Sequence, residues 1–234
     1  EGSSTTLFSQ HFVGLKFAPG LARGVAVLHR KRIEVKISLS EDPAREYQRL
    51  QVALDALQDS IDKLIHQAGL EEGGEHRDIM EAYRMFAHDK GWISRIAEAI
   101  NAGLTAESAV VKAQEEMTER MNLVSSEYIR DRIHDLEDVS NRLLQHLSGD
   151  NKVSGSSSQQ LPARFVLVAR TLGPAELLEY GRKRLKGIVL EDGAATSHIV
   201  IIARAMEIPV VGKISGAYGL IQSGDPLIVD GDNG

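Results

Sequence analysis

Apolar residues recur at helical spacing through the middle of the chain. Between Leu50 and Ile65 they are separated by four, three, four, three and one positions, which places them on one face of a helix. Asp42 and Pro43 predict the start of this helix, and Gly69 predicts its end. Similar patterns predict further helices over about 79–86, 92–100, 105–124 and 129–147. Four or five antiparallel helices with short connections are typical of a bundle.

The flanking regions have the short, β-branched runs bounded by Gly or Pro that are typical of strands. Helical segments are expected between some of these strands, at 174–185 and 197–206, and this alternation predicts an α/β layer. The expected strands are 24–29, 33–37, 165–169, 187–190, 209–211 and 227–229.

Because the first strands precede the helices and the others follow them, we predict a discontinuous α/β domain with an inserted antiparallel helical bundle. The α/β domain is assigned to residues 12–40 and 161–234, and the bundle to 41–149. Residues 1–11 are interpreted as a linker or tag, and the Ser-rich segment 150–160 as a linker. The polar start without Met indicates that the chain is a fragment.

Charge differs between the two parts. Residues 41–148 contain 22 Asp and Glu against 12 Lys and Arg, a net of −10, within a chain whose total is −6. This balance argues against general nucleic-acid binding, which requires basic residues. The absence of Cys excludes thiolate chemistry and disulfides and fits a reducing, cytoplasmic location. No apolar stretch is long enough for a membrane helix.

Among the eight histidines, His198 has the most informative surroundings. The motifs of P-loops, dinucleotide-binding folds, HExxH metalloproteases and GxSxG hydrolases are absent. His198 follows an apolar strand and an Asp192-Gly193 turn, and it falls in the first turn of a predicted helix. A neutral imidazole there could accept a phosphoryl group, which the unpaired N–H groups of the helix start would stabilise. Thr196 and Ser197 could cap the helix and donate to phosphate oxygens.

Several segments resemble those of phosphoenolpyruvate-utilising enzymes. Thr196-Ser197-His198, followed by Ile201–Arg204 and Ile208–Gly212, resembles the phosphohistidine motif of this group. The segments 14–24 and 127–139 resemble enzyme I of the bacterial phosphotransferase system, and 81–92 resembles its nitrogen-branch form. The resemblance implies a swivelling phosphohistidine domain and covers nearly the whole chain from about Phe12.

This resemblance implies a phosphoryl relay. In the family, a C-terminal barrel binds phosphoenolpyruvate and Mg²⁺, and Nε2 of the active histidine accepts the phosphoryl group. The group then passes to a histidine of a small carrier protein, HPr or NPr. We expect this fragment, which lacks the barrel, to need no metal or cofactor itself, to be monomeric, and to partner the carrier and its own barrel.

Positions that match functional residues of relatives can be assigned in the same way. The carrier-binding surface corresponds to Tyr83, Phe86, Trp92, Ile129 and Arg132; the alternative for Phe86 and Trp92 is a place in the bundle core. Arg204 could reach the phosphate or form an ion pair within the domain. The sequence departs from the family in having Ala194 where a second glycine is usual.

A second departure concerns the orientation of the active imidazole. Sugar-branch members carry a Thr that orients the ring, and Leu177 stands at that position. The group that fixes the tautomer of His198 is therefore not identified from the sequence. Two alternatives stay open: the swivelling domain of a dikinase or phosphoenolpyruvate synthase, and a non-catalytic helical adaptor in which His198 is structural.

Overall fold

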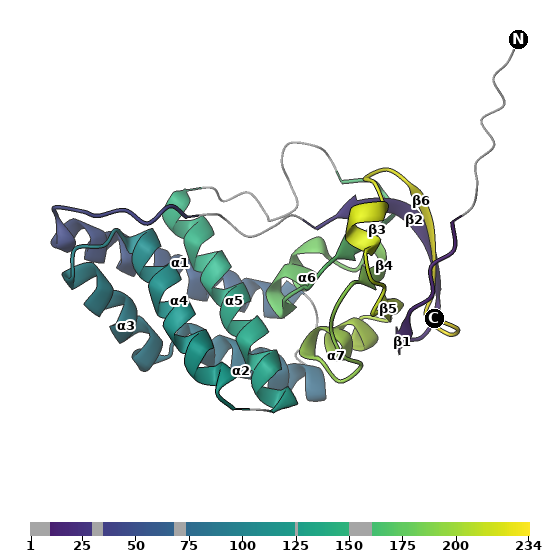
Figure 1. Cartoon of the computed structure of the whole chain (residues 1–234), viewed down its shortest axis with the longest axis horizontal. Helices are drawn as coiled ribbons and strands as arrows, with labels where there is room; N and C mark the ends of the chain where they lie inside the picture. The colour runs from purple at the N-terminus through teal and green to yellow at the C-terminus, as the bar shows by residue number, and fades with distance from the viewer. Residues whose placement is uncertain (1–9, 30–34, 68–73, 125, 150–160) are drawn as a thin grey trace, which may run out of the picture.

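The computed structural model describes residues 10–29, 35–67, 74–124, 126–149 and 161–234. In these ranges a group of long helices lies beside a curled sheet that is covered by shorter helices (Figure 1). The predicted linker 150–160, most of the predicted N-terminal linker and Gly69 lie outside the described residues. The long helices are α1 Pro43–Gln67, α2 Glu75–Ala87, α3 Lys90–Asn101, α4 Ala106–Asn122 and α5 Glu127–Ser148.

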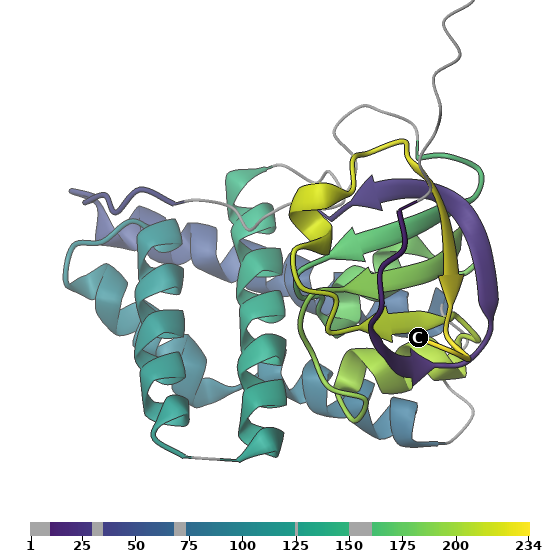
Figure 2. The same ribbon diagram turned by 45° about the vertical axis from the view of Figure 1, so that its right-hand side comes forward.

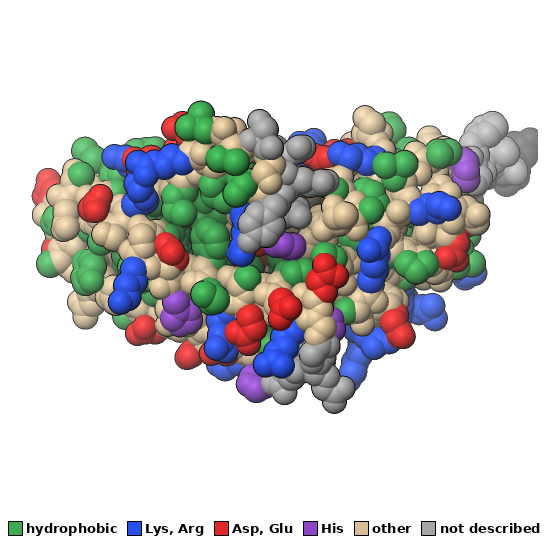
Figure 3. Space-filling view, turned by 90° about the horizontal axis from the view of Figure 1, so that it is seen from below, with side chains coloured by type: hydrophobic (Ala, Val, Ile, Leu, Met, Phe, Trp, Pro, Cys, Tyr) green, Lys and Arg blue, Asp and Glu red, His purple; other side chains and the backbone are tan. Residues whose placement is uncertain are grey.

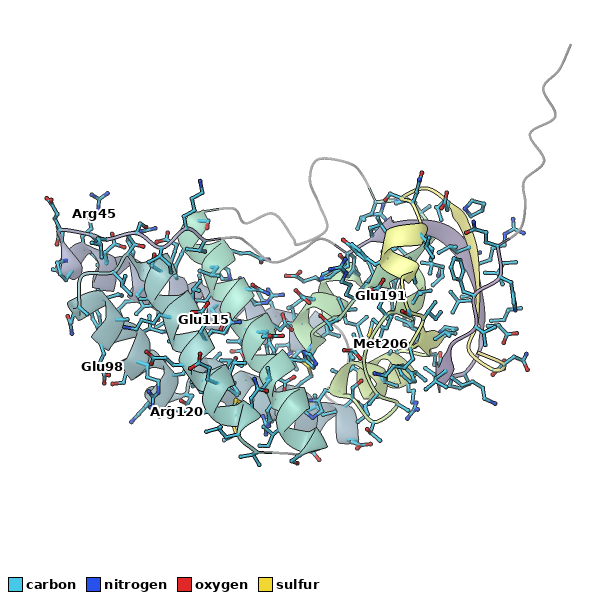
Figure 4. All side chains as sticks on the ribbon, in the orientation of Figure 1. Arg45, Glu98, Glu115, Arg120, Glu191 and Met206 are labelled. Atoms are coloured by element: carbon cyan, nitrogen blue, oxygen red, sulfur yellow. The ribbon has the colours of Figure 1, made fainter. Side chains whose placement is uncertain are left out.

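Side-chain caps determine where several of these helices begin. The Asp42 carboxylate accepts a hydrogen bond from the Arg45 backbone N–H at 3.0 Å, as the predicted start of α1 requires. Asp89 caps α3 and Thr105 caps α4 in the same way. The helices predicted for the bundle are confirmed, whereas the helix predicted at 174–185 ends at Tyr180 and Leu185 already begins a strand. The charged side chains labelled Arg45, Glu98, Glu115 and Arg120 lie on the outside of the bundle (Figure 4).

The sheet combines strands from both ends of the described chain, in the order β1-β5-β4-β3-β2-β6. The four inner strands are mutually parallel, whereas β1 and β6 pair antiparallel at the two edges. Its strands are β1 Leu15–Ala18, β2 Leu21–Leu28, β3 Phe165–Ala169, β4 Leu185–Leu190, β5 Val210–Gly212 and β6 Pro226–Asp230.

Two strand predictions need correction. Residues 15–18 form the edge strand β1, which was not predicted because its outer residues, Leu15 and Lys16, are exposed and break the apolar pattern. The predicted strand 33–37 is wrong for its described part, because 35–37 join no ladder. Leu39 forms only an isolated bridge with Leu104.

The sheet has two buried faces, as expected for a mainly parallel sheet. Alternate residues of β3 show this division: Phe165, Leu167 and Ala169 face the helices, whereas Val166 and Val168 face the inside of the curl. The curl is visible in Figure 2, where the short helix α8 (Ala217–Leu220) covers its inner side. The helix-facing core continues through α6 (Pro174–Tyr180) and α7 (His198–Ala205) into the bundle.

Charged groups are also buried where α5 packs against α6. The Asp138 carboxylate accepts a hydrogen bond from Ala175 N at 2.9 Å, and Arg142 pairs with Glu179. Burial, together with the charge of Glu176, raises the pKa of Asp138 well above its ordinary value. Gly173 is required beside this carboxylate, because an added Cβ would lie 2.3 Å from Asp138 Oδ2. These contacts fix the position of α5 beside the sheet.

Candidate functional site

The loops that follow three parallel strands meet at one cavity. The strands β3, β4 and β5 end at Ala169, Leu190 and Gly212, and the carboxyl ends of parallel strands are where open α/β sheets usually bind ligands. Helix α5 closes the other side, leaving a cavity of about 120 Å³. It is lined by His134, Asp135, Thr171, Leu172, Pro174, Leu190, Asp192, Gly193, Ala194, Ser197, His198, Ile199 and Lys213.

His198 is the first residue of α7, in the first turn as the sequence predicted. The preceding loop turns at Gly193, whose φ of 112° favours glycine. Ala194 has no positive φ, so the family's second glycine is not required for this conformation. The side chain of His198 is 15% exposed and lines the cavity, so its ring is not sealed in the apolar core.

The imidazole of His198 contacts a carboxylate from the helical bundle. Its Nδ1 lies 3.0 Å from Oδ2 of Asp135, which belongs to α5 and is only 2% exposed. A carboxylate accepts hydrogen bonds, so a neutral ring in this position carries its proton on Nδ1. The lone pair is then on Nε2, which makes Nε2 the nucleophilic nitrogen.

Asp135 supplies the contact that the sequence left unassigned. Leu177, at the position of the orienting Thr in sugar-branch relatives, is fully buried in α6. The role of Asp135 was missed, although its spacing held a signal. Helix α5 carries a row of polar residues at helical spacing directly beside its apolar stripe: Asp135, Asp138 and Arg142. This pattern is typical of buried polar groups that contact another element.

The two residues before His198 differ in their surroundings. Thr196 is exposed, whereas Ser197 is buried and lines the cavity. Ser197 stands at the N-cap of α7 with extended backbone angles, but its side chain does not make the predicted capping bond. Its Oγ has no hydrogen-bond partner among the described residues. A buried hydroxyl of this kind is able to donate to a group attached to His198.

Arg204, like Thr196, does not line the cavity around His198. It lies near the C-terminal end of α7, and its Nε donates to the backbone carbonyl of Phe17 at 2.8 Å. Its Nη2 donates to the same oxygen. In this structure Arg204 connects α7 to strand β1 rather than contributing to the cavity around His198.

The predicted carrier-binding residues divide into two groups. Tyr83 and Trp92 have no exposed surface and belong to the bundle core, so their assignment to a docking surface is corrected. They lie on the inner faces of α2 and α3, together with apolar neighbours such as Ile79 and Ile96. Phe86, Ile129 and Arg132 are partly exposed.

Comparison with known proteins places both parts of the chain. Residues 13–132 match the family model of the PEP-utilising enzyme N-terminal domain, and residues 161–234 match that of the PEP-utilising enzyme mobile domain. The chain belongs to the PEP-utilising enzyme family. The two matches cover most of the helical part and the C-terminal α/β part.

Relatives within the family are named phosphoenolpyruvate-protein phosphotransferase, a transferase. The protein of this name from Streptomyces coelicolor is 34% identical over 212 residues, which are 90% of this chain and 36% of that protein. The Bacillus subtilis protein is 28% identical over 221 residues, 92% of this chain and 38% of that protein. The chain thus spans somewhat more than a third of the length of these relatives.

Solved structures agree with this assignment. The solution structure of an enzyme I protein (nEIt) is 30% identical with a TM-score of 0.67, covering 96% of this chain and 91% of that one. The N-terminal domain of the nitrogen Enzyme 1 is 29% identical, also with a TM-score of 0.67, covering 96% and 92%. No helix within the described ranges is long and apolar enough to cross a membrane.

Proposed function

We propose that this chain is the phosphotransfer part of an enzyme I-type phosphoenolpyruvate-protein phosphotransferase, and that His198 carries the phosphoryl group on Nε2. The observation that supports this proposal best is the 3.0 Å contact between His198 Nδ1 and Asp135 Oδ2. This contact gives Nε2 the lone pair that a phosphoryl acceptor needs. The buried Ser197 hydroxyl and the start of α7 lie beside it.

The transfer itself requires little beyond positioning and charge stabilisation. When a phosphorylated HPr- or NPr-type carrier donates, the N–P bond of its phosphohistidine breaks as the bond from His198 Nε2 to phosphorus forms. The electron pair of the broken bond returns to the carrier's ring nitrogen. The proton stays on Nδ1 of His198, and the Asp135 carboxylate stabilises the positive charge that the ring acquires.

The helical bundle is proposed as the place where the carrier binds. Helix α2 contacts α7, so a carrier seated on α2 would lie close to the element that holds His198. Met85 on α2 is 72% exposed, and with Phe86 it offers an apolar contact. Acidic and basic side chains alternate on the face seen from below (Figure 3), so the acidic surplus of the bundle does not form one continuous patch there.

The chain matches little more than a third of the relatives' length. The part of the proposal that concerns phosphoenolpyruvate, Mg²⁺ and a C-terminal barrel therefore rests on the resemblance to those longer proteins. A dikinase or synthase origin is less favoured, because the named relatives are phosphotransferases that match across the helical part as well.

The test is incubation with a phosphorylated HPr-type carrier, followed by mass spectrometry of the chain. We expect one added phosphoryl group that is labile in acid and stable in base, and its loss in His198→Ala. The matched control is His11→Ala, which removes an exposed histidine and should leave labelling unchanged. Labelling that persists in His198→Ala would contradict the site, and no labelling of the wild type would favour the adaptor alternative.

A further inference from the structure

Lys213 holds an unusual backbone conformation beside the His198 cavity. Its φ is 59°, and only one other non-glycine residue in the described ranges, Glu207, has a positive φ. Such a conformation is uncommon for a residue with a side chain, and it persists where the surroundings fix it. Here Gly212 packs against the ring of Phe17 on one side, and Ile214 N donates to Leu190 O on the other.

The side chain of Lys213 bridges two of the loops that form the cavity. Its Nζ lies 2.6 Å from Oδ1 of Asp192, in the loop that precedes α7. Both side chains are about half exposed, so the ion pair is accessible to solvent and can exchange partners at low cost. The Lys213 ammonium and the Gly193 N–H hold the pKa of Asp192 below its ordinary value, so Asp192 stays ionised.

Phosphorylation of His198 would change the charge balance of this cavity. A phosphoryl group brings a charge of about −1.5 to −2. Two carboxylates, Asp135 and Asp192, already line the cavity, and like charges disfavour a further anion. Besides His198, the described residues that line the cavity include two with basic side chains, Lys213 and His134. The Nδ1 atom of His134 lies 3.3 Å from the Glu137 carboxylate.

We propose that Lys213 is a positioning residue for the phosphoryl group on His198, and that its ammonium exchanges Asp192 for the phosphoryl oxygens when the histidine is phosphorylated. This inference rests on the proposed function of His198. Asp192 would hold the lysine beside the site in the unphosphorylated protein and compete with the phosphoryl group for it afterwards. The two residues should therefore have opposite effects on the phosphorylated state.

The test uses phosphoramidate, a small-molecule donor to histidine, so that no carrier is needed, and follows the phosphorylated chain by ³¹P NMR during a pH titration. In Lys213→Met we expect the pKa of the phosphoryl group to rise by about one unit, because a neighbouring cation is lost. Lys213→Arg should restore the wild-type titration. Asp192→Asn should shift the pKa in the opposite direction, because the competing carboxylate is gone.

The outcomes separate this inference from the proposed function. If wild-type His198 takes a phosphoryl group neither from phosphoramidate nor from a phosphorylated carrier, both are overturned. If His198 is phosphorylated but Lys213→Met and Asp192→Asn titrate like the wild type, the role of Lys213 alone is overturned. Equal shifts in the same direction for both variants would also overturn it, because a merely structural disturbance predicts no difference in sign.

Discussion

Replacing Asp135 by Asn tests the proposed chemistry without changing the size of the side chain. The Asp135 carboxylate is almost fully buried, with Oδ2 at 3.0 Å from His198 Nδ1. Its other oxygen, Oδ1, has no hydrogen-bond partner among the described residues. An amide in this position is neutral, and its NH₂ group can donate to Nδ1, which would move the ring proton to Nε2.

The size of the effect follows from the strength of this hydrogen bond. A hydrogen bond to a charged group contributes about 1.5–3 kcal/mol, and each 1.4 kcal/mol corresponds to about a tenfold change in an equilibrium. Without the carboxylate, the His198 ring loses its preference for the tautomer with the proton on Nδ1. The population with a lone pair on Nε2 should therefore fall by about 10- to 100-fold. The rate at which His198 accepts a phosphoryl group should fall by a similar factor.

Although Asp135→Asn should slow phosphorylation, it should leave the stability of the fold unchanged or increase it. Burying a polar atom without a partner costs about 1–3 kcal/mol, and a charged oxygen such as Asp135 Oδ1 costs more than a neutral one. Asp135→Asn removes that charge from the folded protein. We therefore expect an unchanged or higher melting temperature together with slower phosphotransfer.

Three measurements check this prediction: the rate of phosphorylation by a phosphorylated carrier, the ¹⁵N NMR shifts of the His198 ring, and thermal unfolding. Asp138→Asn is the matched control, because Asp138 is buried one turn further along α5 and bonds to Ala175 rather than to His198. A variant with normal rate and an unshifted tautomer would refute the role of Asp135. A slow variant that is also unfolded would show a structural role instead.

Two further predictions concern the α5–α6 contact. Because burial raises the pKa of Asp138, the folded state binds the carboxyl proton of Asp138 more tightly than the unfolded state does. The stability that this proton contributes to the folded state is lost as pH rises above the ordinary pKa near 3.8. Asp138→Asn cannot ionise, so its melting temperature should exceed that of the wild type at pH 7, with a difference that shrinks as pH falls toward 4; a constant difference would contradict the burial argument. Gly173→Ala places a Cβ 2.3 Å from Asp138 Oδ2, and we expect it to lower the free energy of unfolding by about 1–3 kcal/mol in urea denaturation. The control is Gly219→Ala, whose added Cβ has no atom within 4 Å and should change the free energy of unfolding little.

The periodic part of the fold could be predicted from sequence because each helix buries one stripe. Leu50, Leu54, Leu57 and Ile61 are buried as their spacing predicted, and the caps at Asp42 and Thr105 are local signals. Edge elements have no such stripe. Strand β1 was missed for that reason, and residues 35–37 have an apolar pattern without a partner strand.

The site was predictable only as far as its residues are neighbours in sequence. Thr196, Ser197 and His198 follow one another, so a helix start with a histidine could be expected. Asp135 is 63 residues away from His198 and meets it only through the docking of α5. The docking of α5 depends on buried polar contacts with α6, and the spacing of Asp138 and Arg142 along α5 does not say which element they meet.

Tyr83 was assigned to the carrier-binding surface although it lies on the inner side of helix α2. The segment 81–92 was aligned with a surface used by relatives, but alignment gives a position and not the side of a helix. Tyr83 follows Ile79 and Met80 by four and three positions, and helical geometry places these three residues on one face. All three are buried, whereas Met85 on the opposite side is exposed. The helical period of α2 therefore identifies its surface residues, Met85 among them, where the resemblance does not.

The contact between Asp135 and His198 connects the two parts of the molecule at the reacting ring. Its carboxylate comes from the helical bundle and its imidazole from the α/β part, so the favoured tautomer exists only while the two parts are docked as they are here. Separation of the parts would leave the ring without this partner and would expose the buried Asp135 carboxylate to water. For the proposed phosphotransfer this means that a carrier bound on the bundle side would meet Nε2 already oriented, because the docked arrangement holds the ring through Nδ1.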